Sequence, residues 1–362
     1  MAKKLMKGCE AIGEAAIKAG CKLFFGYPIT PQNEIPEYMA HRLPQVGGTF
    51  LQAESEVAAS NMIYGAAGSG ERVFTSSSSP GISLMQEGIS YIAGSELPVV
   101  IVNIMRAGPG LGGILPSQSD YFQATKGGGH GDYRLLVLAP WSVQEAADLV
   151  QDAFDLADYY RNPVMVLGDG LIGQMMEPVE FKAERTPCKP LPPKAWAATG
   201  CSGDRPTNII NSLFLDPEVL ERHNQKLKAK YDLMVRDEVR CASYGTDRPY
   251  EVLVVAYGTV ARVCSTALDD LREDGVGAAL FRPITLFPFP YAELRAAAEN
   301  ARAVLVVELS TGQMIEDVRL ALEGSRPIHF LGRQGGMLIS PEAVSERVSA
   351  ISAGLPEEVR HG

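Results

Sequence analysis

The sequence predicts an α/β protein with two domains, each built on a parallel β-sheet that helices cover on both faces. Three observations predict this architecture. Short apolar runs alternate with helical segments up to about residue 170, a proline-rich polar stretch follows, and the alternation resumes from Glu251. Such alternation builds parallel sheets, because each helix carries the chain back to start another strand in the same direction. We therefore expect a first domain at 1–172, a linker with a charged helix at 173–250, and a second, smaller domain at 251–362.

In the first domain, residue composition predicts the strands and the spacing of apolar residues predicts the helices. Runs rich in β-branched and aromatic residues predict strands at 23–26, 49–52, 73–76, 98–105, 134–138 and 163–167. Helical spacing predicts helices at 8–19, 54–68, 83–94 and 142–160. Ser142 and Glu145 have the spacing of a capping box at the start of the last helix. Thr30, as a cap before Pro31, predicts one further helix, which Pro36 should keep short.

The middle of the chain differs in composition from its two flanks. Four prolines fall between residues 187 and 193, which indicates an extended linker. Asp216 followed by Pro217 predicts the start of a charged helix that runs to about residue 240. Acids are interleaved with its basic residues, so we expect a solvated face for Arg222, Lys226, Lys228 and Lys230.

The second domain repeats the alternation of the first on a smaller scale. Its predicted strands lie at 252–257, 278–281, 304–308 and 328–331. Its predicted helices lie at 260–273, 291–299 and 313–322.

The composition limits the function classes. Lys and Arg total 33 against 43 Asp and Glu, so the net charge is −10, and binding to nucleic-acid phosphates is disfavoured. No apolar run approaches the roughly 18 residues that a membrane-spanning helix needs. Glu10 and Glu14 interrupt the N-terminal stretch, so we expect no signal peptide. The six cysteines lie apart without a C-x-x-C pair, which predicts a cytoplasmic protein with reduced thiols and no zinc or iron–sulfur site of its own.

Two glycine-rich segments have alternative interpretations. Gly108–Gly113 matches the G-x-G-x-x-G motif of dinucleotide-binding proteins and follows a predicted strand. That motif must open a helix, and the residues after Gly113 have no helical pattern, so the match is disfavoured. The second segment, 127–132, surrounds His130 and Asp132 with glycines. It is either an active-site loop with a titratable tip or a plain surface turn, and the sequence leaves both open.

Further segments resemble the α-type subunit of 2-oxoacid:ferredoxin oxidoreductases. They cover nearly the whole chain except the linker, and they are FGYPITP (25–31), QAESEVAA (52–59), TSSSSPGISLM (75–85), RAGPG (106–110), RPITLFP (282–288) and ELSTGQM (308–314). The second of these and the glycine loop look most like the 2-oxoisovalerate (3-methyl-2-oxobutanoate, branched-chain) branch. The resemblance implies a thiamine-diphosphate domain of the pyrimidine-binding type, followed by a transketolase C-terminal-like domain.

The resemblance also implies an enzyme that is active only as a complex. Its reaction would be the CoA-dependent oxidative decarboxylation of a 2-oxoacid to acyl-CoA, CO2 and reduced ferredoxin. A β subunit would hold the diphosphate and Mg²⁺, while γ-type and ferredoxin-like subunits would carry [4Fe-4S] clusters. Gly168-Asp169-Gly170 begins like the magnesium motif of thiamine enzymes, but the next Asn is Asn208, beyond the proline-rich stretch. We therefore interpret this triplet as a turn at a strand end.

The matching motifs place the site residues. Glu56 matches the acid that hydrogen-bonds the pyrimidine ring of the cofactor, and Ser79, Pro80 and Gly81 match the turn that lines this ring. Thr30 and Arg106 match residues that contact the substrate. Arginine suits this role because its planar guanidinium holds a carboxylate by paired hydrogen bonds. Without the resemblance, Glu56 is explained as an acid in a first helical turn, Thr30 as a helix cap and Arg106 as a loop residue.

Three alternatives remain open at this stage. A 2-oxoglutarate enzyme needs a further cation for the second carboxylate, and Lys126 is its candidate. A nicotinamide-dependent dehydrogenase would explain the Gly108–Gly113 motif. A non-catalytic scaffold subunit would use both domains only to hold other chains. No catalytic residue is assigned to the second domain, where Arg282 and the 308–314 turn are expected to pack the assembly.

Overall fold

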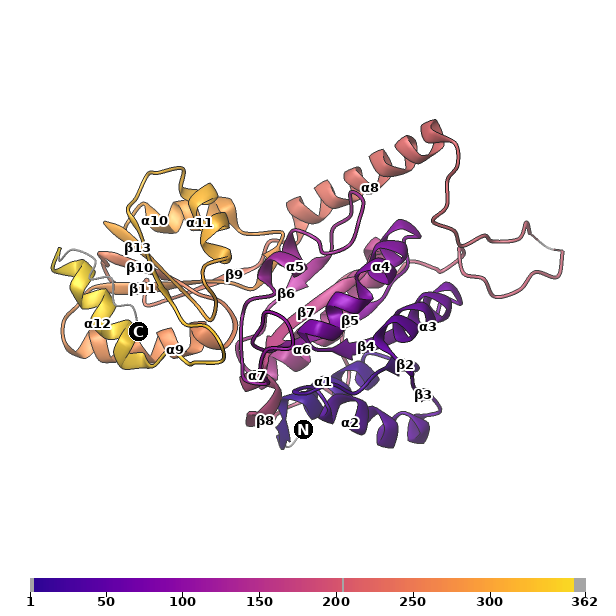
Figure 1. Cartoon of the computed structure of the whole chain (residues 1–362), viewed down its shortest axis with the longest axis horizontal. Coiled ribbons are helices and arrows are strands. Elements are labelled where there is room, and N and C mark those ends of the chain that lie inside the picture. Colours follow the sequence, from indigo (N-terminus) through magenta and orange to yellow (C-terminus); the bar gives the residue numbers. More distant parts are fainter. Residues whose placement is uncertain (1–2, 204, 355–362) are drawn as a thin grey trace.

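The computed structural model describes residues 3–203 and 205–354, so residues 355–362 of the predicted second domain lie outside it. The larger part of the molecule, here called the first lobe, is built on a seven-stranded sheet (Figure 1). Its strands in spatial order are β12 (Thr285–Phe287), β6 (Leu136–Leu138), β7 (Val164–Asp169), β5 (Val100–Met105), β4 (Val73–Ser77), β2 (Leu23–Gly26) and β3 (Thr49–Gln52). All neighbours pair in parallel except β12, which runs antiparallel to β6.

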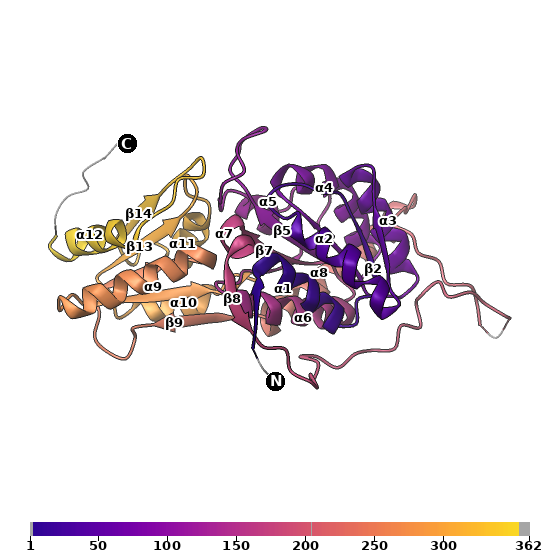
Figure 2. The same ribbon diagram turned by 90° about the horizontal axis from the view of Figure 1, so that it is seen from below.

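Helices cover both faces of this sheet, as predicted (Figure 2). One face carries α1 (Gly8–Lys18), α2 (Glu34–Arg42), the short 3₁₀ turn η1 (Pro44–Val46) and α6 (Val143–Tyr160). The other carries α3 (Glu56–Gly68), α4 (Ser79–Gly94) and α5 (Tyr121–Thr125). Successive strand residues face opposite sides. Val100 and Val102 accordingly join the core under α1 and α6, whereas Ile101 joins the core under α3 and α4.

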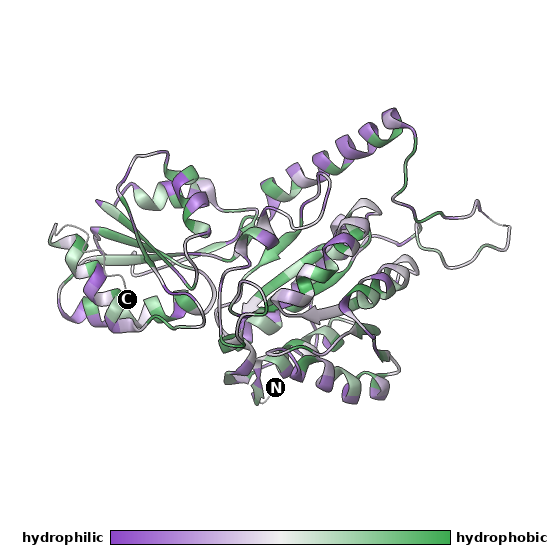
Figure 3. Ribbon diagram, viewed as in Figure 1, coloured by the Kyte–Doolittle hydropathy of each residue, from purple (hydrophilic) through white to green (hydrophobic). Residues whose placement is uncertain are grey.

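The smaller part, here called the second lobe, is a five-stranded sheet in the order β14 (Ile328–Gly332), β13 (Ala303–Glu308), β10 (Val252–Val255), β11 (Ala278–Pro283) and β9 (Cys241–Tyr244). On one face lie α9 (Gly258–Glu273) and α12 (Pro341–Ser352). On the other lie α10 (Tyr291–Ala298) and α11 (Met314–Leu322). Several strands of both sheets are coloured as hydrophobic in Figure 3, and β5 and β10 are the clearest cases by sequence. One buried cluster runs from Ile82 through Tyr121 and Tyr257 to Leu253, so the two lobes share a core.

Four strands were not predicted from the sequence, because each is formed by pairing with a strand far away in the chain. β1 (Lys4–Lys7) pairs with β8 (Met176–Val179) in a small antiparallel sheet, next to the short helix α7 (Gly170–Gln174). β9 lies within the expected linker, yet it pairs with β11. β12 follows β11 after the single residue Ile284, but it joins the sheet of the first lobe. The chain therefore crosses between the lobes inside one nearly continuous extended stretch.

The linker runs as an extended segment to α8 (Pro217–Asp237), the long helix in Figure 1. Asp216 caps α8 as predicted, because its carboxylate accepts the backbone N–H groups of Glu218 and Val219. The solvated face predicted for the basic residues of α8 is wrong for Lys230, whose ammonium is buried against Glu96 at 3.3 Å. Burial lowers the pKa of Lys230 to about 8. Lys226 also pairs with Glu96, so α8 is tied to the first lobe.

Two helix starts differ from the prediction. The helix expected at Thr30–Pro31 begins only at Glu34, because Gln32 N–H donates to Ile29 O at 3.1 Å and closes a turn there. Pro36 falls in the first turn of α2, where its missing N–H breaks no helical bond. The helix expected from residue 83 begins at Ser79, so Ser79, Pro80 and Gly81 form the first turn of α4 and not a loop. Within the described part of the chain, no helix is long and apolar enough to cross a bilayer.

Candidate functional site

The predicted site residues meet where strands of the first lobe end. Thr30 follows β2, Glu56 begins α3 after β3, and Arg106 follows β5. Ser79 and Gly81 begin α4, directly after β4. The carboxyl ends of parallel strands share one edge of a sheet, which is where α/β proteins bind ligands. The following contacts connect these residues in one continuous group.

Arg106 is a buried cation that binds no carboxylate of the described chain. Its side chain is held by carbonyl oxygens, because Nη1 donates to Thr30 O at 3.0 Å and Nη2 donates to Leu111 O at 3.3 Å. Its Nε–H is buried and has no hydrogen-bond partner among the described residues. A buried guanidinium is costly unless an anion compensates it. The arrangement is therefore ready to accept a small anion with hydrogen-bond acceptors, such as a carboxylate.

Glu56 is the first residue of α3 and is only 6% exposed. Ser55 supplies the cap of this helix, since its Oγ accepts the Ala58 N–H at 3.1 Å. The Glu56 carboxylate makes no hydrogen bond to any other described residue. An acid in the first turn of a helix interacts favourably with the helix dipole even when it faces water, so this interaction does not require burial. Helix-dipole stabilisation alone therefore does not explain why this carboxylate is buried.

Gly81 lets the side chains of Glu56 and Ser77 pack closely against the start of α4. A Cβ atom at Gly81 would lie 2.1 Å from Ser77 Oγ and 2.6 Å from Glu56 Oε1, distances that real Cβ atoms do not show. Only glycine therefore fits this position while Glu56 and Ser77 keep their places. Ser77 Oγ and Ser78 Oγ, which lie just before α4 in the sequence, are buried without hydrogen-bond partners among the described residues. Buried polar atoms of this kind are normally satisfied, so the site has unused hydrogen-bonding capacity.

Two site residues were missed by the sequence analysis. Asp120 accepts hydrogen bonds from the Ser79 hydroxyl at 2.6 Å and from the Asn103 side-chain amide at 2.9 Å. The backbone N–H of Arg106 donates to Ser79 Oγ at 3.0 Å, so Asp120 is connected to Arg106 through Ser79. Asn103 carried a signal that could have been read, because it is a fully buried amide inside the otherwise apolar strand β5. Asp120 carried none, since it lies in a polar loop.

The glycine loop with His130 and Asp132 lies elsewhere along α4. The Ser90 hydroxyl donates to His130 O at 2.6 Å, and the His130 ring lies edge-on to Tyr91. Ser90 is three turns after Ser79, roughly 16 Å along the helix axis at 1.5 Å per residue. Both predicted loop residues are exposed. The structure therefore does not bring them into the group around Arg106 within this chain.

The other two glycine motifs have the conformations expected from the sequence. Gly108–Gly113 opens no helix, and the chain runs as a loop from β5 to α5. Gly168 and Asp169 end β7, and the Asp169 carboxylate caps α7 through the N–H groups of Leu171 and Ile172. Its second oxygen accepts the Thr259 hydroxyl at 2.5 Å from the second lobe. The triplet is thus a strand-end turn that joins the two lobes.

The second-lobe residues singled out from the sequence also have structural partners. Arg282 makes two 2.8 Å hydrogen bonds to the Glu145 carboxylate, which joins β11 to the start of α6. Glu308 is buried and accepts the backbone N–H groups of Gln313, Met314 and Ile315 at the start of α11. Burial raises the pKa of Glu308, and these hydrogen bonds oppose the rise. Both side chains are fully used in holding the fold.

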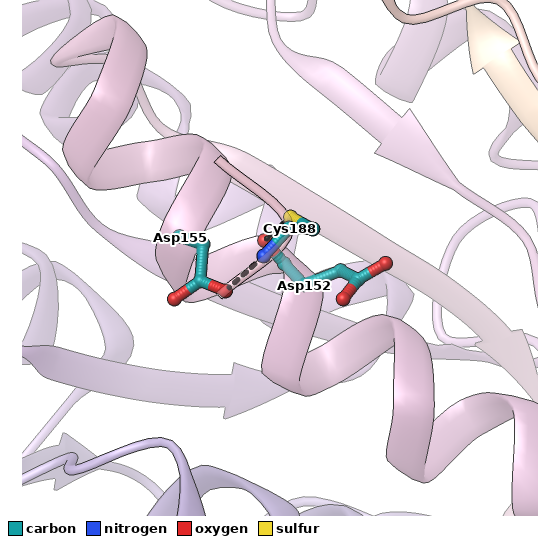
Figure 4. Close-up of side chains that lie close together, drawn as sticks. All are labelled: Asp152, Asp155 and Cys188. Atoms are coloured by element: carbon teal, nitrogen blue, oxygen red, sulfur yellow. Dashed lines mark hydrogen bonds between the residues drawn. The ribbon is translucent and has the colours of Figure 1, made fainter. Parts of the chain in front are cut away.

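Figure 4 shows a carboxylate–thiol cluster in which Asp152 and Asp155 lie on α6 and Cys188 lies in the linker. Asp152, Asp155 and Cys188 place one atom each within 4.8 Å of one another, and the Cys188 N–H donates to Asp155 at 3.1 Å. Burial raises the pKa of the Cys188 thiol to about 11, which keeps it protonated. The two carboxylates are neutralised by three arginines, namely Arg72, Arg185 and Arg240. The cluster therefore fastens the linker to α6.

Comparison with known families shows the class of this protein. Residues 14–236 match the family model described as pyruvate flavodoxin/ferredoxin oxidoreductase, thiamine diphosphate-binding, and residues 250–344 match pyruvate:ferredoxin oxidoreductase core domain II. The chain belongs to this 2-oxoacid:ferredoxin oxidoreductase family. It is 49% identical to the ketoisovalerate oxidoreductase subunit VorB of Methanothermobacter thermautotrophicus, over 97% of this chain and 99% of the relative. It is 39% identical to the 2-oxoglutarate synthase subunit KorA of the same organism, over 94% and 96% of the two chains.

Solved structures agree with this assignment. A 2-oxoglutarate:ferredoxin oxidoreductase from Magnetococcus marinus, with 2-oxoglutarate, coenzyme A and succinyl-CoA bound, superposes with a TM-score of 0.88 at 26% identity. The match covers 97% of this chain and 65% of that longer chain. A split-gene transketolase shares the fold alone, with a TM-score of 0.60 at 14% identity over 96% and 98% of the two chains. The predicted fold class and family are thus confirmed.

Proposed function

We propose that this chain is the α-type subunit of a complex that oxidatively decarboxylates a branched-chain 2-oxoacid to acyl-CoA and CO2 and reduces ferredoxin. The observation that carries the proposal is Arg106, a buried cation without an anionic partner in the described chain. A 2-oxoacid brings the carboxylate that this guanidinium lacks. The Nε–H and an Nη–H would bind that carboxylate, with Thr30 beside them.

The groups around Glu56 suit the pyrimidine ring of thiamine diphosphate. Gly81 lets Glu56 and Ser77 lie close together, and the unpartnered hydroxyls of Ser77 and Ser78 offer hydrogen bonds to a polar ring edge. When bound, this cofactor supplies an electron sink for the carbanion that loss of CO2 leaves behind. Glu56 would hydrogen-bond the pyrimidine ring nitrogen of the cofactor. Ser79, Pro80 and Gly81 would line the ring.

The partners follow from what this sequence lacks. No Asn follows the Gly168–Gly170 triplet before Asn208, and the six cysteines show no cluster-binding spacing. A β subunit would therefore hold the diphosphate and Mg²⁺, and γ-type and ferredoxin-like subunits would carry the [4Fe-4S] clusters. The relatives' names, which call them subunits, support such a complex.

The choice of a branched-chain substrate has two supports. The relative with 49% identity is named for ketoisovalerate. Lys126, the cation that a 2-oxoglutarate enzyme would need, is already held by Asp317 at 2.6 Å. A free 2-oxoglutarate side chain would have to compete with this internal ion pair. We therefore place 2-oxoglutarate second, with the KorA relatives as its support.

The test is a panel of 2-oxoacids assayed with the complex purified together with the chains that accompany this one. We expect CoA-dependent ferredoxin or viologen reduction, with a higher kcat/KM for 3-methyl-2-oxobutanoate than for 2-oxoglutarate. A reversed preference would contradict the branched-chain proposal and leave the family role intact. Oxoacid-independent activity with NAD would instead support a dehydrogenase. Turnover that survives combined replacement of Thr30, Glu56 and Arg106 would support a scaffold.

A further inference from the structure

Asp120 has a side chain that does not serve its own helix. It precedes α5, at the position whose side chain usually caps a helix, but its carboxylate caps no backbone N–H of α5. The carboxylate instead accepts the Ser79 hydroxyl at 2.6 Å and the Asn103 amide at 2.9 Å. These partners come from the start of α4 and from β5. Asp120 therefore joins the two elements that carry the predicted cofactor and substrate residues.

The Ser79 hydroxyl has one hydrogen and two acceptors within reach. Asp120 Oδ2 lies 2.6 Å from Ser79 Oγ, and the backbone oxygen of Arg106 lies 3.2 Å from it. The shorter contact to a charged acceptor takes the hydrogen, because charge-assisted hydrogen bonds are the stronger ones. Ser79 Oγ then offers a lone pair to the Arg106 N–H, which donates to it at 3.0 Å. Without the carboxylate, the hydroxyl would be free to turn toward the Arg106 carbonyl.

The fixed backbone of Arg106 determines where its side chain can go. Arg106 lies just beyond the end of β5, where the sheet no longer holds the chain except by an isolated bridge to Pro116. From this anchor its guanidinium reaches Thr30 O, while Nε–H has no partner in the part of the chain that the structure describes. Side chains that bind a substrate are effective only when their position and orientation are precisely fixed.

We infer that Asp120 is a positioning residue, which acts through Ser79 to hold Arg106 where it binds the carboxylate of the 2-oxoacid. The inference rests on the proposed function, because it requires that Arg106 contacts the substrate. Ser79 gains a second role here, as the connection between Asp120 and Arg106. Nothing in the geometry requires Asp120 to touch the substrate.

The charge of Asp120 and its positioning role predict opposite changes in KM. Burial raises the pKa of its carboxyl, and the hydrogen bonds from Ser79 and Asn103 oppose that rise by favouring the ionised form. An anion close to a site for carboxylates repels the substrate. If Asp120 acted only through its charge, neutralising it would lower KM. If it positions Arg106, neutralising it raises KM.

The experiment measures kcat and KM for the preferred 2-oxoacid in the purified complex carrying Asp120→Asn, Ser79→Ala or both. We expect each single variant to raise KM about tenfold, the effect of losing one charge-assisted hydrogen bond, and we expect Asp120→Asn to change kcat less than about threefold. We expect the double variant to resemble Ser79→Ala, because both residues act on Arg106 by one path. Ser83→Ala is the matched control, an exposed serine one turn further along α4 that should change neither constant.

Arg106→Ala separates failure of this inference from failure of the proposed function. We expect Asp120→Asn to add nothing to the KM of Arg106→Ala. If Arg106→Ala raises KM but Asp120→Asn leaves it unchanged or lowers it, the positioning role is wrong and the substrate site stands. If Arg106→Ala itself leaves KM unchanged, the substrate site is wrong. If Asp120→Asn lowers kcat and thermal stability with KM unchanged, Asp120 has only a structural role.

Discussion

The contact between the two lobes and the strand-end site both bury polar groups, but only the first satisfies them within this chain. Between the lobes, Gln118 donates to Tyr257 O at 2.9 Å and accepts the Leu309 N–H at 3.0 Å. Asp317 there accepts the hydroxyls of Tyr121 and Tyr291 and the Lys126 ammonium. In the strands of the site and the segments that follow them, by contrast, buried polar atoms lack partners among the described residues, namely Asn33 Oδ1, Thr75 Oγ1, Ser77 Oγ, Ser78 Oγ, Asn103 Oδ1 and Arg106 Nε.

The difference separates a structural region from a binding region. Buried polar groups without partners are costly, so folded proteins keep few of them away from ligands. A region that is complete in itself needs nothing further to be stable. A region with unsatisfied donors and acceptors gains stability when a ligand or a neighbouring chain supplies the partners. Changes in the two regions should therefore affect different measurements.

The largest effect should come from Glu56→Gln in the assembled complex. The amide keeps the shape of Glu56 but cannot deliver a carboxyl proton to the cofactor ring. Positioned acids and bases contribute about 10²- to 10⁴-fold to rate, and we expect kcat to fall within that range. Glu54→Gln is the control, an exposed acid two residues earlier that should leave kcat unchanged. Near-normal turnover by Glu56→Gln would refute the assigned role.

A smaller effect is expected from Arg106→Ala, measured as the KM for the 2-oxoacid. Each lost charge-assisted hydrogen bond is worth about 1.5–3 kcal/mol, so KM should rise about tenfold to a hundredfold. Arg106→Lys keeps the charge without the planar fork and should give an intermediate KM. An unchanged KM in the alanine variant would remove Arg106 from the substrate site. The stability of the folded complex should change little in either variant.

Asp317→Asn should give the reverse pattern. The side chain is 2% exposed, and the amide loses the charge that holds the Lys126 ammonium at 2.6 Å. We expect unfolding to become easier by about 2 kcal/mol, measured by chemical denaturation, with kcat and KM of the folded complex nearly unchanged. Asp247→Asn is the control, since it removes an exposed ion pair with Arg272 that should cost less than about 1 kcal/mol. A large loss of turnover in Asp317→Asn would show that the contact between lobes also shapes the site.

Local sequence patterns predicted much of the fold, whereas contacts between residues far apart in the sequence could not be predicted from such patterns. Asp216 starts α8 as expected, and Ser142 Oγ accepts the Glu145 N–H. The second half of the expected capping box does not form, because the Glu145 carboxylate accepts the Trp141 N–H and the Arg282 guanidinium. Thr30–Pro31 has the local signal of a helix start, but α2 begins later because the surrounding fold imposes a turn there. The pairing of Lys230 with Glu96 joins residues far apart in sequence, so no local pattern contains it.

The site was only partly accessible from the sequence, for a similar reason. Motif resemblance supplied Glu56 and Arg106, but their burial and unsatisfied atoms are properties of the folded chain. Asp120 became a candidate only when its distances to Ser79 and Asn103 were known. His130 and Asp132 stay a prediction, since the structure places His130 beside Tyr91 and both residues are exposed in the glycine loop.

Strand β12 belongs to the second half of the chain but pairs in the sheet of the first lobe, which limits where the chain can be cut into fragments. A fragment that stops before residue 250 would keep every helix of the first lobe and still lose the outermost strand of its sheet. The backbone of β6 would then be left as an open edge, free to pair with another molecule. Such a fragment should therefore aggregate more readily than the full chain, and splitting the gene between the two halves would carry a cost in solubility.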